Sequence, residues 1–151
     1  MSRRGHIGMK ELEPLMMLEG RWAGKGKGSY GPFSAEMDAQ VRGRWLLMRQ
    51  EIKVPIVGIT TYVSTQVYGF DEGALTLDFF DTAGSFKFKG ALEGERLRFH
   101  FQDSRAEKTS LYWKEGDDLR FDYVSMEAKD GGDEKKIHFE GSWHRIHDRS
   151  G

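Results

Sequence analysis

The fold of this chain is decided by one glycine-rich stretch, Gly20-Arg21-Trp22-Ala23-Gly24-Lys25-Gly26-Lys27-Gly28-Ser29-Tyr30. A helix is disfavoured there, because each internal glycine costs a helix roughly 1 kcal/mol relative to alanine. In a strand, alternate side chains point to opposite faces, so Trp22 shares one face with the glycines while the lysines take the other. Glycine also allows a strand to bend sharply. The stretch therefore predicts the first, strongly bent strand of a closed β-barrel, with room for a cavity over its glycine face.

The composition predicts one globular domain without a charge-driven partner. The chain has 151 residues, and its 23 lysines and arginines nearly balance 24 acidic residues for a formal net charge of -1. Such a balance draws a protein neither to nucleic acid nor to an anionic membrane. Cysteine is absent, which excludes disulfides, thiolate metal sites and cysteine nucleophiles. We therefore expect a cytoplasmic protein, monomeric or homodimeric, with no nucleic-acid or membrane partner.

The two ends of the chain are predicted to lie outside the fold. Residues 1–8 are basic but lack an apolar run, and they are interpreted as a disordered leader. Residues 148–151 are interpreted as a tail. The expected domain is thus a single barrel over residues 9–147.

A short helix is predicted ahead of the first strand. Leu12, Leu15 and Met16 recur at helical spacing. Pro14 is tolerated only in the first turn of a helix, which favours a start near Glu13. We expect the apolar stripe of this helix to pack against one end of the barrel and close it.

The remainder of the chain alternates apolar and polar residues with the two-residue period of half-buried strands. The clearest run places Phe33, Ala35, Met37, Ala39 and Val41 on one face. A later strand, residues 107–114, holds Leu111 and Trp113. Ten such strands follow one another at spacings of about a dozen residues, joined by short turns. The pattern predicts an all-β fold, a ten-stranded antiparallel up-and-down β-barrel, with a solid-core sandwich as the alternative.

Several motifs resemble those of calycin barrels. Gly20-Arg21-Trp22 resembles the Gly-x-Trp signature of the calycin superfamily, which includes the lipocalins and fatty-acid-binding proteins. The run from Trp22 to Tyr30 resembles the Trp-x-Gly-x-Gly-x-Gly-x-Tyr run of the nitrobindins, ten-stranded haem-binding barrels. Over nearly the whole chain the similarity is closer to an uncharacterised bacterial calycin-like family. That similarity is carried by residues 18–28, Gly43-Arg44-Trp45-Leu46, Tyr68-Gly69-Phe70-Asp71, Phe79-Phe80-Asp81-Thr82-Ala83-Gly84 and Phe139-Glu140-Gly141-Ser142-Trp143.

The resemblance implies a barrel plug and raises the question of haem. In lipocalins the signature tryptophan packs against a basic residue of the last strand, so Trp22 and Arg145 are the expected barrel-closure pair. Nitrobindins hold haem through a histidine near the end of their last strand, a position broadly similar to that of His144. Alternation, however, turns His144 outward, opposite to Trp143. Haem is therefore kept only as an alternative, and the expected cofactor is none.

Histidine spacing also argues against a metal site. His138 and His144 share a face but lie roughly 20 Å apart along an extended strand. Zinc sites need three or four converging ligands. We therefore predict no metal site.

The function predicted from these residues is the binding of a small, mostly hydrophobic molecule inside the barrel. The expected ligand-binding residues are mainly aromatic: Trp22, Met48, Gln50, Tyr62, Phe79, Phe88, Phe99, Phe101, Phe121, Tyr123 and Phe139. No catalytic motif is recognised, although polar residues such as Gln66 and Ser125 could polarise a substrate, so an enzyme is less favoured than a binding protein. The alternatives are a haem-binding sensor or isomerase of nitrobindin type and a protein-interaction module with a filled barrel.

Overall fold

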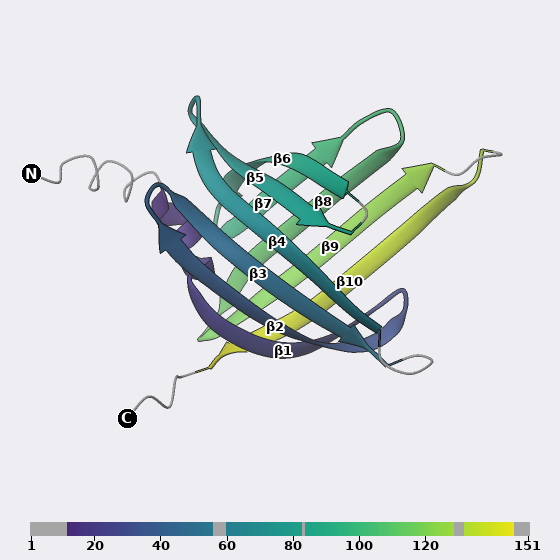
Figure 1. Ribbon diagram of the computed structural model, residues 1–151, viewed down its shortest axis with the longest axis horizontal. Helices are drawn as coiled ribbons and strands as arrows, with labels where there is room; N and C mark the ends of the chain where they lie inside the picture. The colour runs from purple at the N-terminus through teal and green to yellow at the C-terminus, as the bar shows by residue number, and fades with distance from the viewer. Residues whose placement is uncertain (1–11, 56–59, 83, 129–131, 147–151) are drawn as a thin grey trace, which may run out of the picture.

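The computed structural model describes residues 12–55, 60–82, 84–128 and 132–146, which form one closed β-barrel (Figure 1). Ten antiparallel strands follow one another around the barrel, and the first pairs with the last to close it. The predicted all-β, ten-stranded, up-and-down barrel is thus confirmed, and the alternative of a sandwich is wrong.

Each strand is joined to the next as an antiparallel hairpin, so all pairings but one are between neighbours in sequence. The exception is the seam of β1 with β10, in which Trp22 faces Arg145. The strands are β1 (Gly20–Gly28), β2 (Gly31–Arg42), β3 (Trp45–Val54), β4 (Thr60–Asp71), β5 (Ala74–Asp81), β6 (Gly84–Glu93), β7 (Arg96–Gln102), β8 (Ala106–Glu115), β9 (Asp118–Ala128) and β10 (Glu134–Arg145).

The predicted N-terminal helix is a 3₁₀ helix, η1, over Glu13–Leu18, with its proline in the first turn. It lies beside the start of β1 (Figure 1), and Leu12, Leu15 and Leu18 are buried in the barrel core. We call this end of the barrel the closed end, and the opposite end, where β1 finishes, the open end. No helix among the described residues is long and apolar enough to cross a membrane. The predicted leader (1–8) and tail (148–151) lie outside the described residues.

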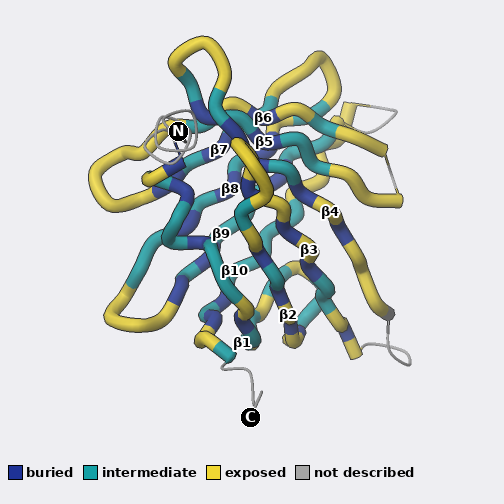
Figure 2. The backbone as a smooth tube through the Cα atoms, turned by 60° about the vertical axis from the view of Figure 1, so that its left-hand side comes forward, coloured by how far each residue is buried: buried dark blue, intermediate teal, exposed yellow. Residues whose placement is uncertain are grey.

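Most strands have the inward face that alternation predicts. In Figure 2, buried and exposed residues alternate along the strands, and exposed residues gather at the hairpin turns. In β2 the inward residues from Phe33 to Ala39 are all buried. In β8 the buried residues are Lys108, Ser110 and Tyr112. Leu111 and Trp113, the apolar residues by which that strand was recognised, have the outward parity.

The sequence suggested that the glycine face of β1 lines an empty space. In the structure this face does not line an empty space. A side chain at Gly26 would overlap the Phe33 ring, and a side chain at Gly28 would meet Phe139. A side chain at Gly24 or Gly26 would also overlap backbone atoms of β10. The glycines therefore serve two purposes: they let β1 approach β10 closely at the seam, and they leave the space that neighbouring aromatic rings fill.

The inward side chains differ in burial along the barrel axis. Towards the closed end Trp22, Leu46, Leu97 and Trp143 are all at 0 % exposure, although Val41 and Phe70 there are only partly buried. Towards the open end Phe33 and Val54 are buried. The inward residues that remain only partly buried there, although they pack on the core, are Ile52, Phe79, Phe86, Phe101, Tyr123 and Phe139. Partly exposed inward aromatic rings are thus concentrated towards the open end.

Candidate functional site

Five aromatic side chains line the open half of the barrel. We call them the aromatic mouth: Phe79 of β5, Phe86 of β6, Phe101 of β7, Tyr123 of β9 and Phe139 of β10. They share the inward parity of buried neighbours on their own strands and are themselves partly exposed. The Phe86 and Phe101 rings meet edge to face with centroids 5.3 Å apart, and the Tyr123 and Phe139 rings stack at 6.3 Å. The mouth therefore offers apolar surface already arranged as rings in contact.

The predicted ligand-binding residues do not all lie at this mouth. Phe79, Phe101, Tyr123 and Phe139 belong to it, whereas Tyr62 stands at the rim of β4 with 50 % of its surface exposed. The remainder lie deeper and are buried, in contact with the core rather than with solvent: Trp22, Met48, Gln50, Phe88, Phe99 and Phe121.

A buried lysine that the sequence analysis missed lies beside the mouth. Lys108 is 7 % exposed, and its Nζ donates to Ser125 Oγ at 3.2 Å and to Glu127 Oε1 at 3.0 Å. The same ammonium lies 4.8 Å from the centre of the Phe86 ring, a cation–π contact. Burial by itself would lower the pKa of Lys108, but Tyr123 and Glu127 favour the charged form more strongly and the pKa is raised. This ammonium is thus already paired within the protein.

The position of Lys108 could have been derived from the hairpin that follows it. The short turn between β8 and β9 sets Tyr112 opposite Phe121 and Lys108 opposite Ser125. Since Phe121 was predicted to point inward, its partner on β8 had to point inward as well. The sequence analysis recognised this strand by its hydrophobic residues Leu111 and Trp113, which have the outward parity, and so it missed the inward position of Lys108.

A chain of polar side chains crosses the buried interior from β8 to β3. Tyr112 is hydrogen-bonded to Tyr68, whose hydroxyl donates to Gln66 Oε1. Gln66 Nε2 donates in turn to Ser64 Oγ at 3.1 Å and to Gln50 Oε1 at 3.3 Å. Burial, together with Tyr112, raises the pKa of Tyr68 well above its ordinary value. The polar chain ends at Gln50, whose Nε2 is buried and has no hydrogen-bond partner among the described residues.

Gln50 also lines a small pocket near the open end, which we call the side pocket. Its volume is about 130 Å³. It lies between strands β3, β4 and β5, and its lining residues are Gln50, Ile52, Thr61, Tyr62, Val63, Ser64, Phe79, Asp81 and Thr82. The side pocket therefore connects the end of the polar chain with Phe79 of the aromatic mouth.

The expected plug residues meet at the closed end. The Arg145 guanidinium lies over the Trp22 ring at 4.4 Å, and its Nη1 donates to the Glu19 carbonyl at 2.8 Å. Trp22 Nε1 donates to the Leu18 carbonyl at 3.0 Å. The Lys114 ammonium lies 5.1 Å from the same ring. Trp22 therefore ties η1, β1, β8 and β10 together at this end of the barrel.

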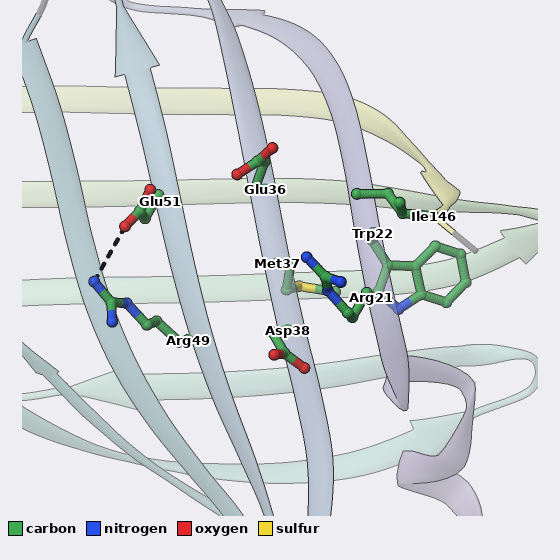
Figure 3. Close-up of a pocket in the computed structure, with 8 residues that line it drawn as sticks. All are labelled: Arg21, Trp22, Glu36, Met37, Asp38, Arg49, Glu51 and Ile146. Atoms are coloured by element: carbon green, nitrogen blue, oxygen red, sulfur yellow. Dashed lines mark hydrogen bonds and ion pairs between the residues drawn. The ribbon is translucent and has the colours of Figure 1, made fainter. Parts of the chain in front are cut away.

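A second depression lies on the outer wall of the barrel, and it is charged rather than apolar (Figure 3). In register across β1, β2 and β3, Asp38 lies between Arg21 and Arg49. Glu51 pairs with Arg49 at 3.1 Å, and Figure 3 shows these side chains on the surface of neighbouring strands. Oppositely charged side chains on neighbouring strands stabilise a sheet modestly. We therefore interpret these charged residues as a stabilising part of the barrel wall.

The described histidines all face away from the interior. His144 is exposed, His100 pairs with Glu107 at 3.5 Å, and His138 is bonded to Asp122 at 2.6 Å. Among the residues that the structure describes, no histidine projects into the barrel, so its interior does not fit a histidine-ligated haem. The ligand atoms of Asp122, His138 and Glu140 do lie within 4.8 Å of one another, but Glu140 is already paired with Lys27 at 3.6 Å.

Comparison with known proteins gives relatives by structure and none by sequence. No protein-family model matches the chain, and no curated protein is significantly similar to it in sequence. The solved structure of Rv2717c from M. tuberculosis is similar with a TM-score of 0.64 and 18% identity, over 91% of this chain and 98% of that one. The S-type phycobiliprotein lyase CPES from Guillardia theta is similar with a TM-score of 0.62 and 12% identity, over 96% and 98%. Both likenesses concern the fold and span nearly the whole of each chain.

Proposed function

Because this chain folds as a calycin-like barrel, we propose that it binds a small, mostly hydrophobic molecule in the open half of the barrel. The observation that carries the proposal is the aromatic mouth, five inward-facing rings that stay partly exposed near the open end of the barrel. Apolar side chains aimed into a barrel normally lose contact with water. Rings that keep it are the expected lining of a ligand site.

The physical basis of binding would be the removal of apolar surface from water. Each Å² of apolar surface that ligand and rings bury contributes roughly 25 cal/mol. The rings already contact one another, so little side-chain freedom is lost when a ligand arrives. Since Glu127 already pairs with Lys108, the ligand needs no charged group to balance this buried ammonium. An uncharged ligand is therefore the simplest occupant.

The proposal places the ligand nearer the open end of the barrel than the sequence suggested. Trp22, Met48 and Phe99 are at most 1 % exposed and pack with the residues around η1. They are assigned to the floor of the site and not to its ligand contacts. The partly exposed rings of the aromatic mouth favour a ligand site over the alternative of a wholly filled barrel.

The test is a titration with N-phenyl-1-naphthylamine, a neutral probe whose fluorescence rises in apolar surroundings. The wild-type protein should bind it with a saturable signal. Phe101→Asp places a carboxylate within the aromatic mouth, and burying that charge should weaken binding by about tenfold or more. Phe101 is partly exposed, so we expect this variant to fold, and its circular dichroism checks that it does.

The matched control is Phe80→Asp. Phe80 is 46 % exposed on the outer parity of β5, so the same substitution there leaves the interior unchanged. Its affinity should equal that of the wild type. Equal weakening by both variants, or no saturable binding by folded wild-type protein, would overturn the proposal and favour a protein-interaction module.

A further inference from the structure

We propose that the side pocket takes a ring-sized group of the ligand that bears a hydrogen-bond-accepting oxygen, and that Gln50 Nε2 donates to this oxygen. The inference rests on the proposed function, because it names the polar part of the molecule whose apolar part the aromatic mouth would hold. It makes Gln50 the residue that sets ligand specificity.

The first observation is that Gln50 is buried with one end of its amide unused. The residue is 5 % exposed, and its Nε2 has no partner in the described structure. Buried donors are nearly always hydrogen-bonded, because an unmet donor retains the full cost of losing water. Gln50 also lines the side pocket, so an acceptor that enters this pocket would come next to the residue that carries the unpaired amide.

The second observation is that the hydrogen bonds of the polar chain use the oxygen end of the Gln50 amide. Tyr68 donates to Gln66 Oε1, and Gln66 Nε2 donates to Ser64 Oγ and to Gln50 Oε1. In this arrangement the free end of Gln50 is its NH₂ group. The amide consequently offers a donor to a ligand that carries an acceptor.

The third observation is the size and lining of the side pocket. Its volume of about 130 Å³ is close to that of a cavity of about 150 Å³ that holds one benzene molecule. Ile52 and Phe79 supply apolar wall, and Gln50 and Ser64 are its buried polar residues. A six-membered ring with a carbonyl oxygen matches the volume, and its oxygen can accept from the Gln50 amide. The described lining residues include no lysine or arginine, so the expected oxygen is that of an uncharged group.

The experiment compares two ligands that differ only at the accepting atom. Acetophenone carries a carbonyl oxygen, and α-methylstyrene carries a methylene group in its place on the same ring. Each is titrated against N-phenyl-1-naphthylamine bound to the full chain. In parallel, the side-chain NH₂ signal of Gln50 is followed by ¹⁵N-resolved NMR. The wild type should prefer acetophenone by roughly fivefold or more, and only acetophenone should shift the Gln50 signal downfield.

Two variants assign the preference to Gln50. Gln50→Met keeps the length of the side chain but removes the amide, so both ligands should bind it equally well. Gln40→Met is the matched control, because Gln40 is exposed on the outer parity of β2 and its substitution should leave the preference intact. The Gln50 NH₂ signal is identified by its loss from Gln50→Met. The wild-type comparison decides the question even if that variant does not fold.

The outcomes separate this inference from the function on which it rests. Equal affinity of the wild type for the two ligands would overturn the inference. An ordered water that accepts the hydrogen bond of Gln50 Nε2 in place of the ligand would give this result. Binding of the neutral fluorophore that neither ring compound displaces would overturn it as well. In both cases the proposed function stands. Failure of all three molecules to bind would instead remove the proposed function.

Discussion

At the scale of single residues, Trp22 and Arg145 hold the closed end together. Arg145 covers the indole ring and also caps the Glu19 carbonyl, where the chain leaves η1 for β1. A guanidinium suits this position, because it can stack on a ring and donate hydrogen bonds from its edge at the same time.

Replacing Arg145 by methionine should lower the free energy of unfolding by about 1 to 2 kcal/mol, since it removes the stacked cation and the hydrogen bond to Glu19. Urea denaturation followed by tryptophan fluorescence measures this change. His144→Ala, an exposed neighbour on the same strand, serves as the control and should shift the midpoint little. A midpoint for Arg145→Met equal to that of the control would show that the contact contributes nothing to stability.

Sequence reasoning at this scale succeeded where a residue repeats a known pattern and failed where its neighbours decide its role. Trp22 and Arg145 could be paired because the resemblance to lipocalins implies that the signature tryptophan packs against a basic residue of the last strand. The buried position of Lys108 depends on the register of the β8–β9 hairpin, and its charge is tolerated only because Ser125 and Glu127 meet it. Gln50 was recognised as a polar residue on an apolar face, but its free amide emerges only from the hydrogen bonds of Gln66.

At the scale of elements, β1 is distinguished by glycines that face the barrel interior. The close approach of its backbone to β10 leaves no room for a Cβ atom at Gly24 or Gly26. The Phe33 ring lies where a side chain of Gly26 would point. The first strand thus contributes Trp22 and a bare surface, and its neighbours contribute the rings that fill it.

Gly26→Val should therefore lower the free energy of unfolding by roughly 2 kcal/mol or more, because backbone and ring must both move to admit the side chain. Thermal unfolding by circular dichroism measures the loss. Ala23→Val, on the opposite face of the same strand beside a shallow surface depression, is the control and should be nearly neutral. Similar melting temperatures for Gly26→Val and wild type would contradict the packing described for this seam.

The strands themselves could be predicted because alternation and turn residues are local signals. The 3₁₀ form of η1 was not expected in detail, although its start at Glu13 and its buried leucines were. The emptiness predicted over the glycines was wrong, because the space above a glycine belongs to whichever neighbouring side chain can reach it. The packing of side chains over the glycines depends on several strands at once, so the residue pattern of one strand does not predict it.

At the scale of the whole molecule, buried tyrosines link stability to alkaline pH. Burial raises the pKa of both Tyr68 and Tyr112 above the ordinary value of 10.0. Below pH 10 both tyrosines are neutral in the folded and unfolded chain, and the stability they confer is fully present. Above pH 10 the unfolded chain loses these protons while the folded chain keeps them, so the free energy of unfolding falls as pH rises.

We expect each of these tyrosines to contribute a loss of about 1.4 kcal/mol per pH unit in that range. Urea midpoints at successive pH values above 10 measure the slope. Tyr112→Phe should make the slope shallower, whereas Phe80→Leu, a change of a non-titrating residue that is 46 % exposed, should leave it close to that of the wild type. An identical slope in Tyr112→Phe and wild type would rule out this linkage.

The partly exposed rings of the aromatic mouth leave the core of the barrel incompletely covered near its open end. A molecule seated among the mouth rings would act as the missing part of that core, present only in the folded state. The free energy of unfolding would then depend on the ligand concentration. It would rise by about 2.7 kcal/mol when free ligand reaches a hundred times its dissociation constant. The melting temperature of the protein in its host would therefore rise with the concentration of free ligand around it.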